Sequence, residues 1–249
     1  MAHGPASTLL RARTLAAAVL ATLLAASGAA CAADDEHENR DPLEPLNRRV
    51  FALNQWMDRI AIRPAAELYR SLVPDPVEFA VYNFFDNLAE PVSMLGSALQ
   101  GSPRKTLVST GRFAVNSTLG VAGLFDPATR LGLKDQQEDI GQALAIWGLE
   151  DTPYLVLPFW GPVTLTTIPD RVLVWWLAPA ILDDYWHLSL RVVDTVSFRA
   201  DALAASALVD EAAVDPYAFT REGFLQRRRY QRYDGNPPVE DLDQLFEDF

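Results

Sequence analysis

Proline limits how long any helix in this chain can be. The 249 residues include 17 prolines, and many of them interrupt stretches whose apolar residues recur at helical spacing. Proline lacks a backbone N–H and clashes with the preceding turn, so it fits the first turn of a helix but costs about 3 kcal/mol in the interior. We therefore expect a mainly α fold of short amphipathic helices that turn corners, with at most one small β-hairpin.

The helix boundaries can be predicted from apolar periodicity and from boundary residues. Apolar residues follow at three- and four-residue steps from Leu43 to Ile60, and Asp41 with Glu44 has the spacing of a capping box around Pro42. Pro91 is expected to separate two helices, and Tyr154–Leu157 is the best strand candidate. After the first helix, which ends at Pro64, helices are expected over 64–73, 77–88, 91–101, 104–119, 134–147, 169–182, 185–198, 199–209 and 215–232.

The only cysteine, Cys31, lies where a signal peptide would end. Arg11 and Arg13 precede an apolar run over 15–26, and small residues lead up to the thiol. This order predicts a lipoprotein signal over 1–30 with cleavage before an acylated Cys31. The apolar run is shorter than the ~20 residues that a spanning helix needs. Gly28 occupies a position where such signals usually carry leucine, so cleavage that releases a soluble exported protein is the alternative.

Composition argues against nucleic-acid binding and against catalysis. The formal net charge is −12, which should repel nucleic acid. Beyond the leader only His37 and His187 remain, and neither a Gly-x-Ser-x-Gly nor a His-Glu-x-x-His motif occurs. The glycines at 96 and 101 have phosphate-loop spacing, but Lys105 stands too far along for a nucleotide site. We expect no enzyme, no cofactor and no metal site.

Apolar segments and a charged tail suggest contacts outside the chain. Residues 172–182 are too short to span a bilayer, and their tryptophans fit either an interfacial segment or a kinked core helix. The membrane-rim candidates are Trp175, Trp176 and Trp186. Residues 239–249 hold five acids and no base. Their apolar residues have the spacing of an amphipathic helix that docks on a partner, the alternative being a disordered solubilising tail. These docking candidates are Leu242, Leu245, Phe246 and Phe249.

Several motifs in one order resemble the MlaA/VacJ family of Gram-negative lipoproteins. They include Asp41-Pro42-Leu43-Glu44, Asn83-Phe84, Glu90-Pro91, Arg112-Phe113, Gly123-Leu124-Phe125-Asp126, Asp139-Ile140-Gly141-Gln142, Pro153-Tyr154-Leu155-Val156-Leu157-Pro158 and Asp215-Pro216-Tyr217. The resemblance covers 41–235 and so divides the chain into a signal peptide over 1–30, an acidic tether over 31–40, a helical domain over 41–235 and an acidic tail over 236–249.

The resemblance implies a ring-like helical protein, lipid-anchored on the periplasmic face of the outer membrane. Such proteins associate with a trimeric porin and pass phospholipid to a soluble periplasmic carrier, so that phospholipid misplaced in the outer leaflet is removed. Two departures from the family pattern lie at 148–152 and 166–170, and they leave gating by the 148–170 region open. A scaffold that binds a porin without transporting lipid is the alternative, and a lipid hydrolase is disfavoured by the missing nucleophile and base.

Polar residues inside otherwise apolar helices are the candidates for a lipid passage. A phospholipid headgroup crosses hydrocarbon at high cost, and a polar lining with an apolar exterior would lower that barrier. The candidates are Asn47, Arg48, Asn54, Asn83, Asn87 and Asn116. The alternative is that these asparagines cap the ends of broken helices.

Overall fold

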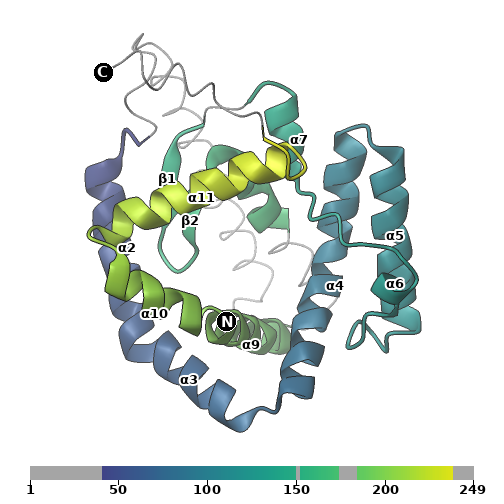
Figure 1. The fold of residues 1–249 in the computed structure, drawn as a ribbon, viewed down its shortest axis with the longest axis horizontal. Coiled ribbons are helices and arrows are strands. Elements are labelled where there is room, and N and C mark those ends of the chain that lie inside the picture. The colour runs from purple at the N-terminus through teal and green to yellow at the C-terminus, as the bar shows by residue number, and fades with distance from the viewer. Residues whose placement is uncertain (1–40, 150–151, 174–183, 238–249) are drawn as a thin grey trace, which may run out of the picture. The chain divides into compact units, whose positions relative to one another are not determined.

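The fold was obtained as a computed structural model in which residues 41–149, 152–173 and 184–237 are described. All of them belong to the compact unit that begins at Asp41. The helices and strands, coloured along the chain in Figure 1, are α2 (Glu44–Met57), the π-helix η1 (Asp58–Ile62), α3 (Arg63–Leu72), α4 (Asp75–Leu99), α5 (Pro103–Thr118), α6 (Pro127–Arg130), α7 (Ile140–Ile146), β1 (Tyr154–Leu157), β2 (Gly161–Thr164), the 3₁₀-helix η2 (Leu165–Thr167), α9 (Asp184–Asp201), α10 (Leu203–Ala212) and α11 (Pro216–Arg232).

Contacts between these elements close a circuit within the unit (Figure 1). α2 packs on β1, β2 leads into η2, η2 packs on α7, and α7 packs on α4. The circuit returns through α9, which contacts both α4 and α3, and α3 joins α2 through η1. α5 packs along α4 and carries α6, so the pair lies on the outer side of α4. The predicted ring-like, mainly α fold is confirmed.

The sheet consists of one antiparallel hairpin, as predicted. Tyr154 pairs with Thr164 and Leu157 with Gly161. Both Phe159 and Gly161 have positive φ, 66° and 73°, which closes the tight connection between the strands. Tyr154 and Val156 are buried and form a small apolar cluster with Tyr217 of α11. The hairpin therefore lies between α2 and α11, and it joins the two ends of the described chain.

Pro91 does not break its helix, which corrects the expectation of separate helices on either side of it. α4 continues from Asp75 to Leu99 with Pro91 inside. An isolated helix would lose about 3 kcal/mol to such a proline. Here α5 packs along α4, and Glu90, which precedes the proline, forms an ion pair with Arg112 of α5. Tertiary contacts therefore outweigh the local preference.

Two other predictions were wrong at helix starts. Asp41 does not cap α2, whose N-cap is Leu43 without any side-chain bond, so the capping box is absent. The Asp41 carboxylate is buried and accepts hydrogen bonds from Asn47 and Tyr217 instead. The helix predicted over 134–147 forms only over Ile140–Ile146, because Gln137 has a φ of 51° and Asp139 then caps α7.

Candidate functional site: a polar interior under an apolar exterior

The interior of this fold is more polar, and its surface carries more large apolar side chains, than an ordinary water-soluble domain. Among the described residues, fifteen buried ones are polar or charged and twelve are hydrophobic. Large apolar side chains lie outside, including Leu72 at 70 %, Leu107 at 72 % and Phe159 at 76 % exposure. Single exposed hydrophobics are normal, but extended apolar surface indicates a membrane or protein partner. Within the described ranges, no helix has the length and apolarity required to cross a bilayer.

The outward apolar surface runs over most of the circuit. On α2 the periodic residues Leu46 and Leu53 are exposed, together with Trp56. The other exposed large apolar residues include Leu68 and Leu72 on α3, Phe79 on α4, Leu107 on α5, Leu119 and Phe125 after α5, Phe159 and Trp160 at the hairpin tip, and Val192 and Phe198 on α9. Most elements of the circuit therefore present apolar side chains to their surroundings.

The inward side of α2 holds what we call the hairpin network, formed by Asp41, Asn47, Asn54, Tyr154 and Tyr217. Asn47 is 1 % exposed. It donates to Tyr154 O at 3.0 Å and accepts from Val156 N at 2.9 Å. Asn54, two turns further on, donates to Leu157 O at 2.9 Å and accepts from Phe159 N at 3.0 Å. Each amide side chain thus bonds one backbone carbonyl of the hairpin and the backbone N–H two residues later. A neighbouring strand would bond the same groups, so the two asparagines satisfy the unpaired edge of β1.

Charged groups extend the hairpin network to α11. Asn47 donates to Asp41 Oδ1 at 2.7 Å, and the Tyr217 hydroxyl donates to Asp41 Oδ2. Arg48 lies 4.4 Å over the Tyr217 ring and bonds Asp215 Oδ2 at 2.8 Å, which lowers the pKa of Asp215 to about 2. Burial, and then the nearby Asp41, raise the pKa of Tyr154 to about 12. The start of the described chain, the hairpin and α11 are therefore held together by one set of polar contacts.

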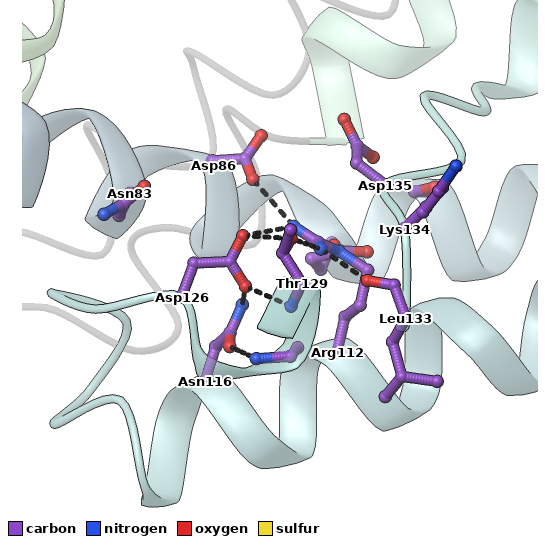
Figure 2. A network of polar contacts seen from close by, with 12 residues as sticks. Asn83, Asp86, Arg112, Asn116, Asp126, Thr129, Leu133, Lys134 and Asp135 are labelled. Carbon is purple, nitrogen blue, oxygen red and sulfur yellow. Dashed lines mark hydrogen bonds and ion pairs between the residues drawn. The ribbon is translucent and has the colours of Figure 1, made fainter. Parts of the chain in front are cut away.

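A second set, which we call the Arg112 network, links α4, α5 and α6 (Figure 2). The buried guanidinium of Arg112 donates to Glu90 Oε1, to Thr129 Oγ1 at 2.9 Å and to Leu133 O at 2.9 Å. Its Nη2 also lies 3.3 Å from Asp86 Oδ2 and 3.5 Å from Asp126 Oδ2. Burial raises the pKa of both Asp86 and Glu90, against the opposing effect of Arg112.

Two buried asparagines fix the segments beside this network. Asn116 donates to Asp126 Oδ1 at 3.1 Å and accepts from Ala128 N at 3.1 Å, which fixes the start of α6. Asn87 donates to Ser117 Oγ at 3.0 Å. Gly123, at φ 91°, packs so closely on Asn87 that an added Cβ would lie 2.7 Å from the Asn87 Cβ. Glycine is required there by both space and backbone conformation.

A third contact joins α7 to α11 and to the segment after η2. Asp170 accepts from Ile140 N at 2.7 Å and from Gly141 N at 3.2 Å, at the start of α7. Asp139 caps α7 through Gln142 N and also pairs with Arg228 of α11. Burial, and then the neighbouring Asp139, raise the pKa of Asp170 to about 6. Two backbone N–H groups therefore hold the Asp170 carboxylate in a position where burial disfavours its charged form.

This fold and its polar contacts can be compared with known proteins. The model of the family described as MlaA lipoprotein matches residues 39–231. The chain belongs to the MlaA lipoprotein family. The intermembrane phospholipid transport system lipoproteins MlaA of Shigella flexneri and Escherichia coli are 32 % and 31 % identical over 226 residues, covering 87 % of this chain and 87 % of each relative. An uncharacterized protein of Rickettsia bellii is 35 % identical over 191 residues, 76 % of this chain and 75 % of that protein.

A solved structure agrees with the MlaA assignment. It was determined in work on the structural basis for maintenance of bacterial outer membrane lipid asymmetry. It superposes with a TM-score of 0.68 at 31 % sequence identity, over 79 % of this chain and 99 % of that chain. The fold of this MlaA-family chain is therefore shared with a protein studied at that membrane.

The predicted passage residues of this MlaA-family chain differ in how deeply they are buried. Asn47, Asn87 and Asn116 are buried and bonded to their own chain, and Asn54 is half-buried. Asn83 stays near the edge, with one 3.4 Å contact to Leu124 O, and in Figure 2 it lies apart from the guanidinium of the Arg112 network. Asn47, Arg48 and Asn54 are thus grouped at the hairpin, and Asn116 lies at the Arg112 network. Their role in a passage remains a prediction.

Several predicted residues lie outside the described part of the chain. They are Cys31, Trp175, Trp176, Leu242, Leu245, Phe246 and Phe249. Trp186 lies in α9, but its side chain is likewise not described. Within the described ranges, no group of three or more potential ligands could hold a metal.

The sequence patterns singled out Asn47 and Asn54 of the hairpin network, but they did not indicate the Arg112–Glu90 pair or the buried position of Asp41. Arg112 and Glu90 were visible only as family motifs, because 22 residues separate them and no periodicity relates them. Asp41 was assigned to a helix cap, although the same residue type also suits a buried acceptor. The sequence signal that could have indicated the buried Arg112 is a charged residue between apolar residues of a predicted helix.

Proposed function

We propose that this protein is a lipid-anchored outer-membrane component of an intermembrane phospholipid transport system. In this proposal Cys31 carries the acyl anchor on the periplasmic face, and the helical unit lies in the inner leaflet of that membrane. The protein removes misplaced phospholipid from the outer leaflet and hands it to a periplasmic carrier. The observation that carries the proposal is the combination of many exposed large apolar side chains with a largely polar set of buried ones.

A monolayer is a solvent in which this distribution is stable. Exposed side chains such as Leu72 and Leu107 would be unfavourable in water but match acyl chains, at about 25 cal/mol per Å² transferred. Buried polar groups then need partners within the protein, as the hairpin and Arg112 networks provide. The printed names of the Escherichia coli and Shigella flexneri relatives support phospholipid as the cargo.

The headgroup needs a polar route, because a charge in hydrocarbon is costly. Asn54 is half-buried, and its amide is already bonded on both sides to the hairpin. The other two predicted passage residues that are not buried are Arg48 and Asn83, with 41 % of the Arg48 side chain exposed. We assign them the direct contacts with headgroups. We assign the buried Asn47, Asn87 and Asn116 to holding the wall in shape. The tail candidates would dock on the carrier, and a trimeric porin would be the neighbour in the membrane.

Lipid extraction tests the proposal most directly. Mass spectrometry of the protein purified in mild detergent should find copurified phospholipid, and Asn83→Leu should lower its amount and sensitise cells to detergent without lowering the protein level. Asn54→Leu serves as a comparison that disturbs the hairpin instead. Absence of bound lipid, together with unchanged detergent resistance of a stably expressed Asn83→Leu, would contradict transport.

The exposed apolar surface also favours a second candidate function. A scaffold that binds a porin and moves no lipid would require the same exterior, because an apolar surface fits a protein as well as acyl chains. Porin copurification that survives when lipid binding is abolished, with normal lipid asymmetry, would favour the scaffold.

A further inference from the structure

The connection between α5 and α6 has no polar side chain over residues 119–125, which we call the apolar loop. Leu119, Val121 and Phe125 are 71 %, 58 % and 60 % exposed. The uncharged stretch is longer than the loop itself, since residues 113–125 include no acidic or basic residue. Connections that face water are usually rich in polar residues. The composition of the apolar loop therefore indicates apolar surroundings.

The backbone of the apolar loop bonds within its own segment. Six backbone N–H groups over 119–125 donate to carbonyls of residues 115–121, at 2.8 to 3.3 Å. The carbonyl of Leu124 accepts from Asn83 Nδ2 at 3.4 Å. Water would bond exposed backbone groups in an ordinary surface loop, but hydrocarbon offers no such partner. The internal bonding therefore suits a loop that is surrounded by acyl chains.

The apolar loop keeps its side chains at a conformational cost. Val121 and Ala122 have φ of 54° and 57°, in the left-handed region. This region is unfavourable for residues with a Cβ, and most of all for a β-branched one such as valine. Glycine at position 121 would relieve the strain but would remove an exposed apolar side chain. Strained backbone of this kind is common where a loop contacts a ligand, so the side chain of Val121 is expected to make such a contact.

Contacts with the Arg112 network fix both ends of the apolar loop (Figure 2). Asn116, near the end of α5, donates to Asp126 Oδ1 at 3.1 Å and accepts from Ala128 N at 3.1 Å. Asp126 Oδ2 in turn lies 3.5 Å from Arg112 Nη2. These contacts tie the residues before the loop to those after it. The loop is therefore an apolar projection on a polar base.

We propose that the apolar loop inserts among the acyl chains of the leaflet to which the protein is attached, and that the Arg112 network holds it in that shape. A groove on a partner protein is the alternative surrounding, but protein interfaces normally have a polar rim, and residues 119–125 have no polar side chain to bond it. The inserted loop adds to the acyl anchor proposed for Cys31, since stable membrane attachment needs more than one contact. The inference rests on the membrane location in the proposed function, but it does not require that lipid is transported.

Depth measurements in lipid vesicles test the proposal. The full mature chain is reconstituted in vesicles of phosphatidylethanolamine and phosphatidylglycerol without any other protein, and a bimane label is attached to Leu119→Cys or Phe125→Cys. A nitroxide deep in the acyl chains should quench either label more than a nitroxide near the headgroups. Aqueous iodide should quench either label several times less than a label on Arg104→Cys, an exposed position near the other end of α5. The unsubstituted protein, treated in the same way, gives the background from Cys31.

A charge placed in the apolar loop gives an independent readout. Phe125→Glu, added to the Leu119→Cys variant, should raise iodide quenching to nearly the value at Arg104, because a charge is costly in hydrocarbon. The matched control, Arg104→Glu in the same variant, should leave quenching at Leu119 unchanged.

Flotation of the vesicles separates this inference from the proposed function. Protein that floats with the vesicles, but whose labels at Leu119 and Phe125 are quenched by iodide as strongly as the label at Arg104, would overturn the insertion of the loop alone. Strongest quenching by the nitroxide near the headgroups would also overturn it. Protein that does not float would contradict the membrane location, and the inserted loop with it.

Discussion

The hairpin network and the Arg112 network hold buried polar groups in different ways. The hairpin network joins amides and a tyrosine hydroxyl to the Asp41 carboxylate, and apart from the bond between Asn47 and Asp41 its partners are 103 to 176 residues apart in the chain. The Arg112 network is built on a buried cation, and its partners lie 10 to 26 residues apart. The first closes the circuit of helices, whereas the second fixes one local group, α4, α5 and α6. Loss of a charge should therefore cost more energy, and loss of an amide should affect more of the chain.

Removal of the Arg112 cation should have the largest effect. Arg112→Met leaves Glu90, only 3 % exposed, without its cation, and removing one partner of a buried pair costs about 3–5 kcal/mol. The free energy of unfolding, from denaturant titration of the purified protein in detergent, measures the loss. Arg104→Met on the same helix is exposed and should stay within about 0.5 kcal/mol of the parent.

A double variant sharpens that test. Adding Glu90→Gln to Arg112→Met removes the uncompensated charge and should recover part of the lost stability. If Arg112→Met unfolds like the parent, the buried ion pair does not hold α4 and α5 together. If the double variant is no better than Arg112→Met, lost packing and not charge explains the effect.

Asn47→Leu should lower the free energy of unfolding less than Arg112→Met does, but it should loosen a larger part of the chain. It leaves Asp41, Tyr154 O and Val156 N without their buried partner, at about 2–4 kcal/mol in total. Because these contacts join distant segments, hydrogen exchange should rise together in α2, the hairpin and α11, while α4 and α5 stay protected. A uniform rise across the whole unit would show that the two networks are not separate.

The contrast between the networks also explains what the sequence could predict. The period of Leu46, Val50 and Leu53 correctly predicts a helix, but a period alone does not say which solvent its apolar side faces. In α2, Leu46 and Leu53 are exposed, whereas Val50 packs on the hairpin cluster and Asn47 and Asn54 bond the hairpin. The hairpin and most helix starts could be predicted from local turn and proline chemistry. The continuous helix α4 around Pro91 could not, because the contacts that compensate for this proline come from α5.

The contribution of Asp170 to the free energy of unfolding should depend on pH, and replacing it should have an effect of intermediate size. Its folded pKa, about 6, lies above the usual 3.8, so between these values the folded state holds a proton that the unfolded state has released. Stability from this group therefore falls as pH rises from about 4 to 6. Asp170→Asn should be about 1–2 kcal/mol more stable than the parent at pH 7.5, less than the full shift because the amide replaces only one acceptor. The gain should vanish near pH 4.

Thermal unfolding midpoints at both pH values measure this difference. Asp201→Asn, at an exposed position at the end of α9, should change little at either pH. A gain for Asp170→Asn that is the same at pH 4 and pH 7.5 would mean that the charge of this carboxylate is not what destabilises the fold.

Asn54→Leu should have the smallest effect and the most local one. Asn54 is half-buried, and its amide bonds only Leu157 O and Phe159 N, at the end of the hairpin nearest the tip. Water can replace partners there, so the cost should be about 1 kcal/mol, compared with the fully buried Asn47. Hydrogen exchange should rise at Phe159 while the amide of Val156 remains protected by Asn47. Exchange that rises equally at both amides would mean that the two asparagines act as one unit, and that the edge of β1 opens all at once.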